Sequence, residues 1–274
     1  GTCQGVFELL DIPYAMASIG ASTNGMDKVT MKKLFSFHNI PLIPYKWYYR
    51  EDLEKNIDKI LDDIEKNILS PFIVKPSNLG SSIGISKAKD RKELKNAIEI
   101  AMQYDSKIII EKAVENLREI NCSVMGFHND LKVSVCEEPV AIDSILSFED
   151  KYVRSNSKTK GLTRKIPAEI DEILREKIEY FAKEAFKAID CSGLARVDFL
   201  LEDNKNIYVN EINTIPGSIS YYLWAPKGIS FKDLINELLE IAQKQYNEKK
   251  KNLYKFDADL YNKINKNAIK SIVK

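Results

Sequence analysis

The sequence predicts an α+β fold, built from antiparallel β-hairpins and separate amphipathic helices. Residues 196–201 and 207–212 are apolar runs rich in strand-forming side chains, and the polar residues 202–206 join them, which is the pattern of a β-hairpin. Two further apolar runs within residues 72–85 flank a loop of Pro, Ser, Asn and Gly. Apolar residues at helical spacing in 170–189 predict a long amphipathic helix that leads directly into the hairpin.

The composition limits the classes of function. With 274 residues, the chain can bury a sizeable core as one large domain or two small ones. Its 41 basic and 40 acidic residues nearly cancel, so we expect no nucleic acid among its partners. No apolar run approaches the length of a membrane span and no signal peptide precedes the first motif, so we expect no membrane partner either.

Cysteine and histidine usage narrows the chemistry. The cysteines are scattered, without a CxxC motif or disulfide-dense spacing, which is typical of buried free thiols in a reducing cytoplasm. Only His38 and His128 are present, so a histidine-based metal site or a Ser-His-Asp triad has little to build from. The four cysteines are Cys3, Cys122, Cys136 and Cys191.

The first third of the chain is predicted to be mainly helical. Residues 1–12 have apolar positions at helical spacing and predict a short helix. Asn24 is predicted to cap the next helix, 24–38, with Lys28 in its first turn, where a helix N-terminus favours anions. Residues 53–68 keep helical spacing on one face and predict a third, structural helix.

Residues 72–85, FIVKPSNLGSSIGI, are predicted to form a strand that ends at Lys75, then a loop, then a second apolar run. Small residues let backbone N–H groups approach an anion, and the hydroxyls of Ser81 and Ser82 add donors, so the loop is a candidate lid over phosphates. Lys75 would be a point charge for phosphate. Because the lysine precedes the glycines, this is not a Walker A loop. Such a loop is more often only a connection.

The remaining elements follow from capping and periodicity. Asp90 and Glu93 form a capping-box pattern before a helix that would cover the sheet holding Lys75. The other predicted elements are strands at 108–114, 120–127 and 131–140, a polar mobile loop at 147–167, helices at 170–189 and 230–242, and a lysine-rich surface tail at 244–274.

The hairpin at 196–212 carries the candidate metal ligands. Strand alternation puts Arg196 and Asp198 on one face, and likewise Glu211 and Asn213. Two carboxylates and an amide oxygen form a hard-oxygen set that suits Mg²⁺. Arg196 would then face any negative charge that develops there. An acidic face that simply meets solvent explains the hairpin alone about as well.

Several motifs occur in order along the chain. MDK is followed by IVKPSNLGSSIGI, IIIEKAV, RVDFLL and VNEINTIPG. Together with the opening GTCQGVFELLDIPYAM, this combination resembles the ATP-grasp ligases and, within them, the D-alanine–D-alanine ligase family, over about residues 1–242. The resemblance implies an ATP-grasp fold, in which two α+β lobes sandwich ATP.

The resemblance also divides the chain. The opening resembles part of the family's GEDGT-type motif, so we expect a fragment that lacks most of the N-terminal domain and its substrate-binding glutamate. The expected parts are a remnant of the N-terminal domain at 1–22, an ATP-grasp N-lobe at 23–118, a C-lobe with the Mg²⁺ site at 119–245, and a lysine-rich C-terminal extension at 246–274.

The resemblance implies a set of nucleotide contacts. Glu111 and Lys112 match the family's E-K pair, next to which backbone groups meet adenine. Glu119 matches the glutamate that takes the ribose hydroxyls, with one residue inserted before it. The implied nucleotide-binding residues are Lys28, Lys75, Ser81, Ser82, Glu111, Lys112, Val114 and Glu119.

The implied chemistry is carboxylate–amine ligation, in which ATP supplies a phosphoryl group to form an acyl phosphate that the amine attacks. Asp198, Glu211 and Asn213 would hold Mg²⁺, with Mn²⁺ as a substitute. Arg196 and the backbone N–H of Gly217 would stabilise the tetrahedral intermediate.

Two loops complete the implied catalytic set. Ser81 would close the phosphate lid, and FEDKY places Lys151 and Tyr152 on the substrate side of the active site. In the family, a tyrosine at the second of these positions favours amino-acid over hydroxy-acid acceptors, so Tyr152 is counted with the catalytic residues.

The segment after NTIPG departs from the family. The family typically has a pattern like MTSHSL, whose last serine anchors the carboxylate of the second substrate, whereas Ser218 to Leu223 is SISYYL here. Tyr222 stands at the serine position and Tyr221 at the histidine position. Ser218 and Tyr222 are therefore the candidate acceptor-binding residues, and the larger ring would reshape the pocket.

Three hypotheses follow. The first is a cytoplasmic D-amino-acid ligase that serves peptidoglycan precursors, with small-molecule amino acids as substrates and a homodimer formed through the missing domain. The second keeps the ATP-grasp chemistry but joins another acid and amine, as Tyr221 and Tyr222 suggest. The third is a non-catalytic nucleotide-binding protein, motivated by the missing N-terminal glutamate.

Overall fold

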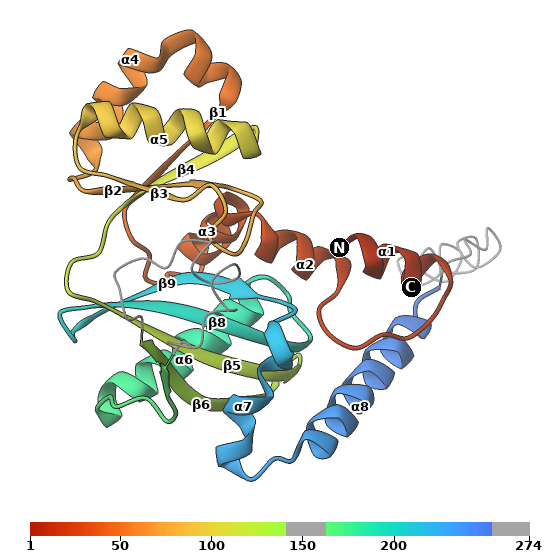
Figure 1. Cartoon of the computed structure of the whole chain (residues 1–274). Helices are drawn as coiled ribbons and strands as arrows, with labels where there is room; N and C mark the ends of the chain where they lie inside the picture. The colour runs from red at the N-terminus through yellow and green to blue at the C-terminus, as the bar shows by residue number, and fades with distance from the viewer. Residues whose placement is uncertain (141–162, 254–274) are drawn as a thin grey trace, which may run out of the picture.

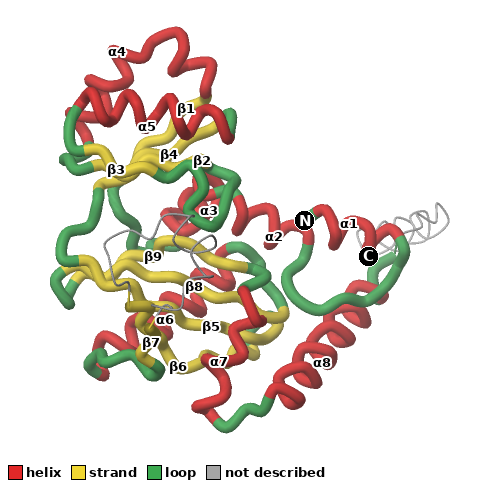
Figure 2. Tube along the Cα trace, in the orientation of Figure 1, coloured by secondary structure: helices red, strands yellow, loops and turns green. Residues whose placement is uncertain are grey.

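The computed structural model describes residues 1–140 and 163–253, and its two β-sheets lie one above the other (Figure 1). The smaller sheet has four strands in the order β1-β4-β2-β3, and the larger has five in the order β7-β6-β5-β8-β9. The strand pairs within both sheets are antiparallel. Helices cover one face of each sheet, while the N-terminal helices extend to one side (Figure 2). The predicted α+β class is therefore confirmed.

The smaller sheet exposes a polar face toward the larger one. Helices α4 (Arg50–Asn67) and α5 (Arg91–Tyr104) cover its other face with apolar side chains. Strand alternation puts Lys75 and Glu111 on the opposite side from that core. α5 begins at the predicted cap, because Asp90 Oδ1 accepts a hydrogen bond from Glu93 N at 2.9 Å. The strands are β1 (Tyr45–Tyr49), β2 (Phe72–Pro76), β3 (Ser86–Ala88) and β4 (Lys107–Lys112).

The larger sheet has one apolar and one polar face. From Ala195 to Glu202, buried and half-buried residues alternate along β8. The apolar face packs against α6 (Glu172–Ala188). The predicted strands and the hairpin are confirmed. The strands are β5 (Leu117–Phe127), β6 (Asp130–Val140), β7 (Thr163–Lys165), β8 (Gly193–Glu202) and β9 (Asn206–Asn213).

One part of the predicted loop at 147–167 is wrong. Residues 163–165 form the edge strand β7, which pairs with β6. A three-residue edge strand is too short for a period-2 pattern to show in the sequence. The rest of the predicted loop, up to residue 162, lies outside the described residues.

The predicted start of a helix at Asn24 is also wrong. The segment forms two helices, α2 (Ile19–Met26) and α3 (Lys28–Phe37). Ser18 caps α2, and the carboxylate of Asp27 caps α3 by accepting hydrogen bonds from Val29 N at 3.0 Å and Thr30 N at 3.1 Å. A carboxylate at this position also interacts favourably with the positive end of the helix dipole, so Asp27 is a stronger cap than Asn24.

We expect Asp27→Asn to lower the free energy of unfolding by about 1–2 kcal/mol at pH 7. Burial alone would raise the pKa of Asp27, but hydrogen bonds from Lys107, Ser77 and the Thr30 N–H outweigh it and lower the pKa to about 2. Because the folded-state pKa lies below the unfolded value, this stability is present above about pH 4 and is lost as the pH falls toward 2. Urea unfolding at pH 7 and at pH 3 tests it: a difference between the two proteins that does not shrink at pH 3 would contradict the assignment.

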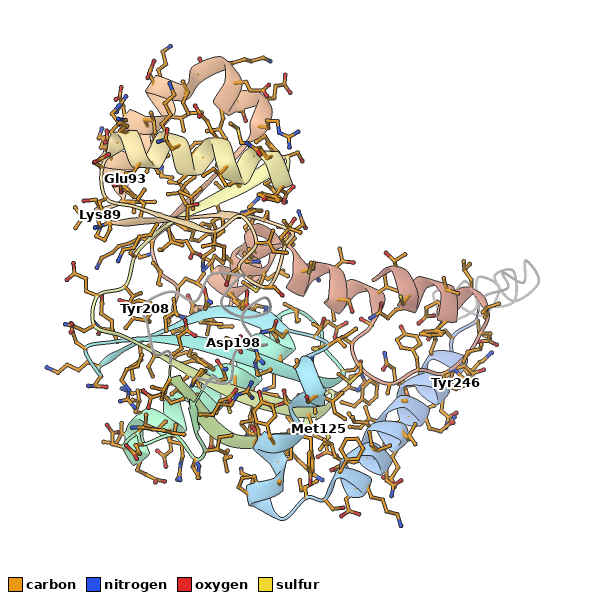
Figure 3. All side chains as sticks on the ribbon, viewed as in Figure 1. Lys89, Glu93, Met125, Asp198, Tyr208 and Tyr246 are labelled. Carbon is orange, nitrogen blue, oxygen red and sulfur yellow. The ribbon has the colours of Figure 1, made fainter. Side chains whose placement is uncertain are left out.

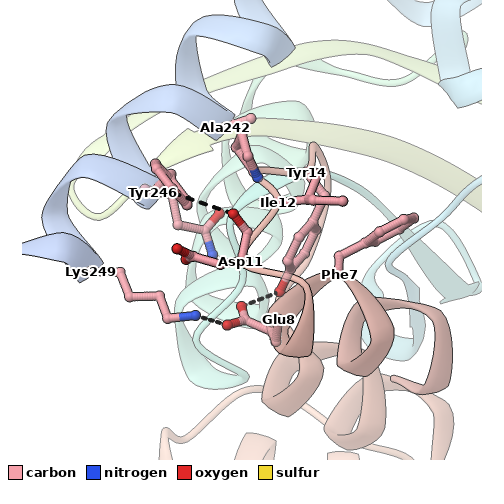
Figure 4. A pocket seen from close by; sticks show the side chains of 10 residues that line it. Phe7, Glu8, Asp11, Ile12, Tyr14, Ala242, Tyr246 and Lys249 are labelled. Atoms are coloured by element: carbon pink, nitrogen blue, oxygen red, sulfur yellow. Dashed lines mark hydrogen bonds and ion pairs between the residues drawn. The ribbon is translucent and has the colours of Figure 1, made fainter. Parts of the chain in front are cut away.

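Residues of the first and last described helices meet at a small cavity (Figure 4). α1 (Thr2–Leu9) and α8 (Phe231–Lys250) line a cavity of about 100 Å³. Glu8 accepts a hydrogen bond from the Tyr14 hydroxyl at 2.9 Å and pairs with Lys249. Both helices were predicted, but α8 continues past residue 242, so the first part of the predicted tail is helical. Among the described residues, none of the helices is long and apolar enough to span a membrane.

Candidate active site

Three lysines and a glutamate meet between the two sheets. Lys28 and Lys32 lie one turn apart on α3, while Lys75 and Glu111 come from β2 and β4. Glu111 Oε2 lies 2.6 Å from Lys75 Nζ, and Glu111 Oε1 lies 2.9 Å from Lys32 Nζ. Lys28 Nζ lies 3.9 Å from Glu211 Oε2, which belongs to the larger sheet. We call Lys28, Lys32, Lys75 and Glu111 the lysine cluster.

The lysine cluster has an excess of positive charge that is only partly solvated. Burial would raise the pKa of Glu111, but the ammonium groups of Lys32 and Lys75 outweigh it and lower the pKa to about 2. Burial lowers the pKa of Lys28 and Lys32, and the charge of Lys75 lowers both further. Lysines that repel one another are stabilised when a polyanion binds, so the cluster fits phosphate groups.

Strands β8 and β9 place the predicted metal ligands opposite one another. Asp198 is the direct cross-strand partner of Glu211, and Arg196 that of Asn213. Arg196 donates to both oxygens of Asp198, at 2.6 and 2.8 Å. Asn213 Nδ2 donates to Asp198 Oδ2 at 2.9 Å. Figure 3 shows Asp198 in the middle of the larger sheet.

A β-bulge connects this hairpin to the lysine cluster. Asp198 pairs with Glu211 and Phe199 with Val209, so Asn210 has no partner residue on β8. Its Oδ1 accepts a hydrogen bond from Lys75 Nζ at 3.2 Å, across the two sheets. Sequence reasoning missed Asn210, because a bulge leaves no periodic mark.

The side-chain oxygens of Asp198, Glu211 and Asn213 suit a divalent cation. Burial raises the pKa of Asp198 to about 6, and the Glu211 and Glu119 carboxylates add to this rise, while the Arg196 guanidinium opposes it. A cation between the facing carboxylates would relieve that repulsion, and all three predicted ligands offer hard oxygens. Residues 1–140 and 163–253 hold no metal-binding group of three or more His, Cys, Asp or Glu. The amide oxygen of Asn213 would be the third ligand of the predicted set.

The predicted phosphate lid connects β2 and β3. Its backbone is strained at Ser81 and Ser82, whose φ values are +56° and +60°. These values lie in the left-handed region, which residues other than glycine rarely adopt. The carbonyl of Leu79 accepts a hydrogen bond from Lys28 Nζ, so the lid contacts the lysine cluster. Such strain is concentrated at functional loops.

The turn that follows the hairpin is strained as well. Ser218, Ile219 and Ser220 have φ values of 51°, 46° and 51°, and Ile219 is β-branched, which makes this conformation costly. Gly217 and Ser218 are exposed at the start of this turn. The turn is followed by α7 (Tyr221–Trp224), so its geometry sets where Tyr222 lies.

The other residues predicted to bind the nucleotide lie in different environments. Lys112 Nζ lies 3.3 Å from Glu202 Oε1, and Val114 lies in the connection between the two sheets. Glu119 is exposed on β5, and its charge contributes to the raised pKa of Asp198. The structure thus brings the two lobes' predicted residues to one region, although Lys151 and Tyr152 lie outside the described residues.

Tyr222 belongs to a polar group that the sequence did not predict. Its hydroxyl donates to Glu137 Oε1 at 2.9 Å, and Asn121 Nδ2 donates to the same oxygen at 2.9 Å. The Arg164 guanidinium lies 4.5 Å from the centre of the Tyr222 ring. Alternation along β5 and β6 could have placed Asn121 and Glu137 on the polar face, but Arg164 fell within the predicted loop.

Two lobes of antiparallel sheet, with a lysine cluster on one and paired carboxylates on the other, define an ATP-grasp ligase. The family model described as "D-ala D-ala ligase C-terminus" matches residues 34–240. The chain therefore belongs to the D-alanine–D-alanine ligase family, whose members depend on ATP. The predicted family, fold and ligase class are confirmed.

Sequence relatives agree with this assignment. The chain is 42% identical over 262 residues to a D-alanine–D-alanine ligase of Acetivibrio thermocellus, covering 94% of this chain and 67% of the relative. It is 41% identical over 262 residues to the ligase of Staphylococcus epidermidis, covering 94% and 71%. The chain thus spans about two thirds of the length of these relatives.

Solved structures give the same result. The D-alanine–D-alanine ligase from Coxiella burnetii is similar with a TM-score of 0.76 and 28% identity, over 92% of this chain and 66% of that one. The VanG D-Ala:D-Ser ligase from Enterococcus faecalis has a TM-score of 0.76 and 30% identity, over 88% of this chain and 68% of that one. These two ligases have different second substrates in their names, so the fold does not determine the acceptor.

Proposed function

We propose that the protein containing this chain is an ATP-dependent ligase that forms D-alanyl-D-alanine, or a close D-amino-acid dipeptide, for peptidoglycan precursors. The observation that carries the proposal is the lysine cluster opposite the Asp198–Glu211 pair, with Lys28 Nζ 3.9 Å from Glu211 Oε2. A site that brings cations for phosphate next to oxygen ligands for a metal suits phosphoryl transfer. The names of the sequence relatives supply the substrate class.

Ligation requires a carboxylate oxygen to become a leaving group, which phosphorylation by ATP achieves. In this proposal, Lys28 and Lys75 contact phosphate oxygens, and Ser81 and Ser82 close over them. The two carboxylate oxygens of Glu111 pair with Lys32 and Lys75, so we do not propose a direct contact from Glu111 to the nucleotide. Its carboxylate instead orients Lys75, while Lys112, Val114 and Glu119 remain the proposed contacts to adenine and ribose.

We propose that Asp198, Glu211 and Asn213 hold Mg²⁺, with Mn²⁺ as a substitute. When bound, the ion would neutralise charge on the phosphoryl oxygens. Arg196 keeps Asp198 oriented through two hydrogen bonds and faces the same region. Arg196 and the Gly217 N–H would then stabilise the tetrahedral intermediate when the amine attacks.

We further propose lobe boundaries at residues 22, 118 and 245, a homodimer, and a cytoplasmic location. Lys151, Tyr152 and Ser218 are proposed to lie on the substrate side of the active site. Amino-acid substrates and ATP suit an enzyme of the cytoplasm, and we retain these predictions on that basis.

A second candidate keeps the same chemistry but uses another acceptor amine. The observation that favours it is the hydrogen bond from the Tyr222 hydroxyl to Glu137, because this hydroxyl is engaged with a protein carboxylate. A non-catalytic nucleotide-binding protein is less favoured, because such a protein has no need for the Asp198–Glu211 pair beside the lysine cluster.

The experiment that tests the function is mass spectrometry of the products of the intact protein with Mg-ATP and D-alanine. D-alanyl-D-alanine with an equal amount of ADP would support the first candidate. ADP formation only when D-serine, D-lactate or another amino acid is added would support the second. Nucleotide binding without ADP release under any of these conditions would rule out both ligase functions.

A further inference from the structure

The guanidinium of Arg164 is held beside the active-site sheet by two contacts and remains partly exposed. Its Nη1 lies 3.5 Å from Glu137 Oε2, and its Cζ lies 4.5 Å from the centre of the Tyr222 ring. The Arg164 side chain remains 41% exposed, whereas Glu137 is 1% exposed. One edge and one face of the guanidinium are therefore fixed by described residues, and the exposed part of the side chain can reach a ligand.

Glu137 is the anchor of this arrangement. Its Oε1 is occupied by Tyr222 and Asn121, while its buried Oε2 has no hydrogen-bond donor and only the longer contact to Arg164. A buried carboxylate needs a cation nearby, so its charge draws Arg164 onto the Tyr222 ring. Glu137 thus fixes both the phenol and the guanidinium, without being accessible itself.

The strand register connects this group to the reaction centre. Glu137, Asn121, Asp198 and Glu211 are successive cross-strand partners on β6, β5, β8 and β9. Tyr222 is also close enough to Arg196 that its hydroxyl interacts with that guanidinium. Tyr222 therefore contacts Arg164 with its ring and interacts through its hydroxyl with Arg196, which lies beside the carboxylate pair.

We propose that Arg164 binds the α-carboxylate of the amine substrate and makes the enzyme specific for free α-amino acids. The attacking amine must reach the activated carboxyl group near Arg196, and in an α-amino acid the carboxylate is only two bonds from that amine. The proposed function already places Arg196 at the tetrahedral intermediate, and among the described residues Arg164 is the other guanidinium that contacts Tyr222. Glu137 is a positioning residue that acts through Arg164.

This inference rests on the proposed ligase function and is tested by internal competition. The intact protein receives Mg-ATP and an equal mixture of D-alanine and D-alaninamide, and mass spectrometry measures the ratio of D-alanyl-D-alanine to D-alanyl-D-alaninamide. This ratio reports the relative kcat/KM of two acceptors at one site. Damage to the fold or to ATP binding lowers both products alike and leaves the ratio unchanged.

We expect the wild-type protein to favour the free acid, and Arg164→Met to lower the product ratio by roughly 30-fold or more. Arg164→Lys should recover part of the ratio, because it keeps the charge but loses the planar fork. Glu137→Gln should give an intermediate ratio, since it keeps an acceptor for Tyr222 but releases Arg164. The matched control is Lys165→Met, which removes a neighbouring cation that pairs with Glu169 at 2.9 Å.

An unchanged ratio in Arg164→Met, or an equal drop in Lys165→Met, would overturn the proposal. If the wild-type protein ligates another amino acid, the same comparison is made between that acid and its carboxamide. An error in the proposed acceptor is then separated from an error in the proposed role of Arg164. If the wild-type protein ligates no amine at all, the proposed function fails first and the role of Arg164 falls with it.

Discussion

Replacing Glu211 by Gln is expected to lower kcat by roughly a thousand-fold, which is the scale for losing one preorganised charge-stabilising group. The substitution keeps the size of the side chain but removes a negative charge from the pair with Asp198, its direct cross-strand partner. A neutral amide is a weaker ligand for Mg²⁺, and Lys28, 3.9 Å away, loses its counter-charge. Steady-state ADP release at saturating Mg-ATP measures the effect.

Stability distinguishes this loss from ordinary damage. Burial is the main cause of the raised pKa of Asp198, and the Glu211 carboxylate adds to it. Removing the Glu211 charge relieves this repulsion, which offsets the ion pair lost with Lys28, so the melting temperature should stay about equal. The control variant is Glu184→Gln, which removes a carboxylate paired with Lys187 on α6, on the apolar side of the same sheet. Normal turnover in Glu211→Gln, or a lowered melting temperature together with lost activity, would contradict the metal assignment.

The hairpin that carries Glu211 could be predicted because its local signals agree. Two strand-forming runs, a polar turn and strict alternation all place Asp198 and Glu211 on one face, and the structure pairs them directly. The exposed face of an isolated hairpin has the same pattern, however. Only the order of several motifs along the chain favoured a candidate metal site over a solvated surface.

The parts that sequence reasoning missed depend on contacts between distant segments. Asn210 reaches Lys75 only because of a bulge on β9, and Arg164 reaches Tyr222 only because residues 163–165 add an edge strand to β6. The cap of α3 was misplaced because Asn24 and Asp27 are both good N-cap residues. Asp27 is selected by Ser77 and Lys107, which are distant in sequence.

Replacing Glu111 by Gln is expected to have the largest effect on stability, lowering the free energy of unfolding by about 3–5 kcal/mol. Glu111 is 2% exposed and balances Lys32, at 2.9 Å, and Lys75, at 2.6 Å. Without its charge, two buried ammonium groups lose the carboxylate that pairs with both of them. Urea unfolding at pH 7 measures the loss.

Lys32→Met should behave differently, because it leaves Glu111 paired with Lys75 and removes the excess buried cation. We expect it to cost much less than Glu111→Gln, and the double variant Lys32→Met/Glu111→Gln to recover about 1 kcal/mol or more relative to Glu111→Gln alone. Recovery on removing a second partner shows that like-charge repulsion, and not a lost hydrogen bond, is the source of the instability. A double variant less stable than Glu111→Gln would mean that Lys32 stabilises the protein through packing. It would also mean that the lysine cluster has no destabilising excess of positive charge that a bound phosphate could relieve.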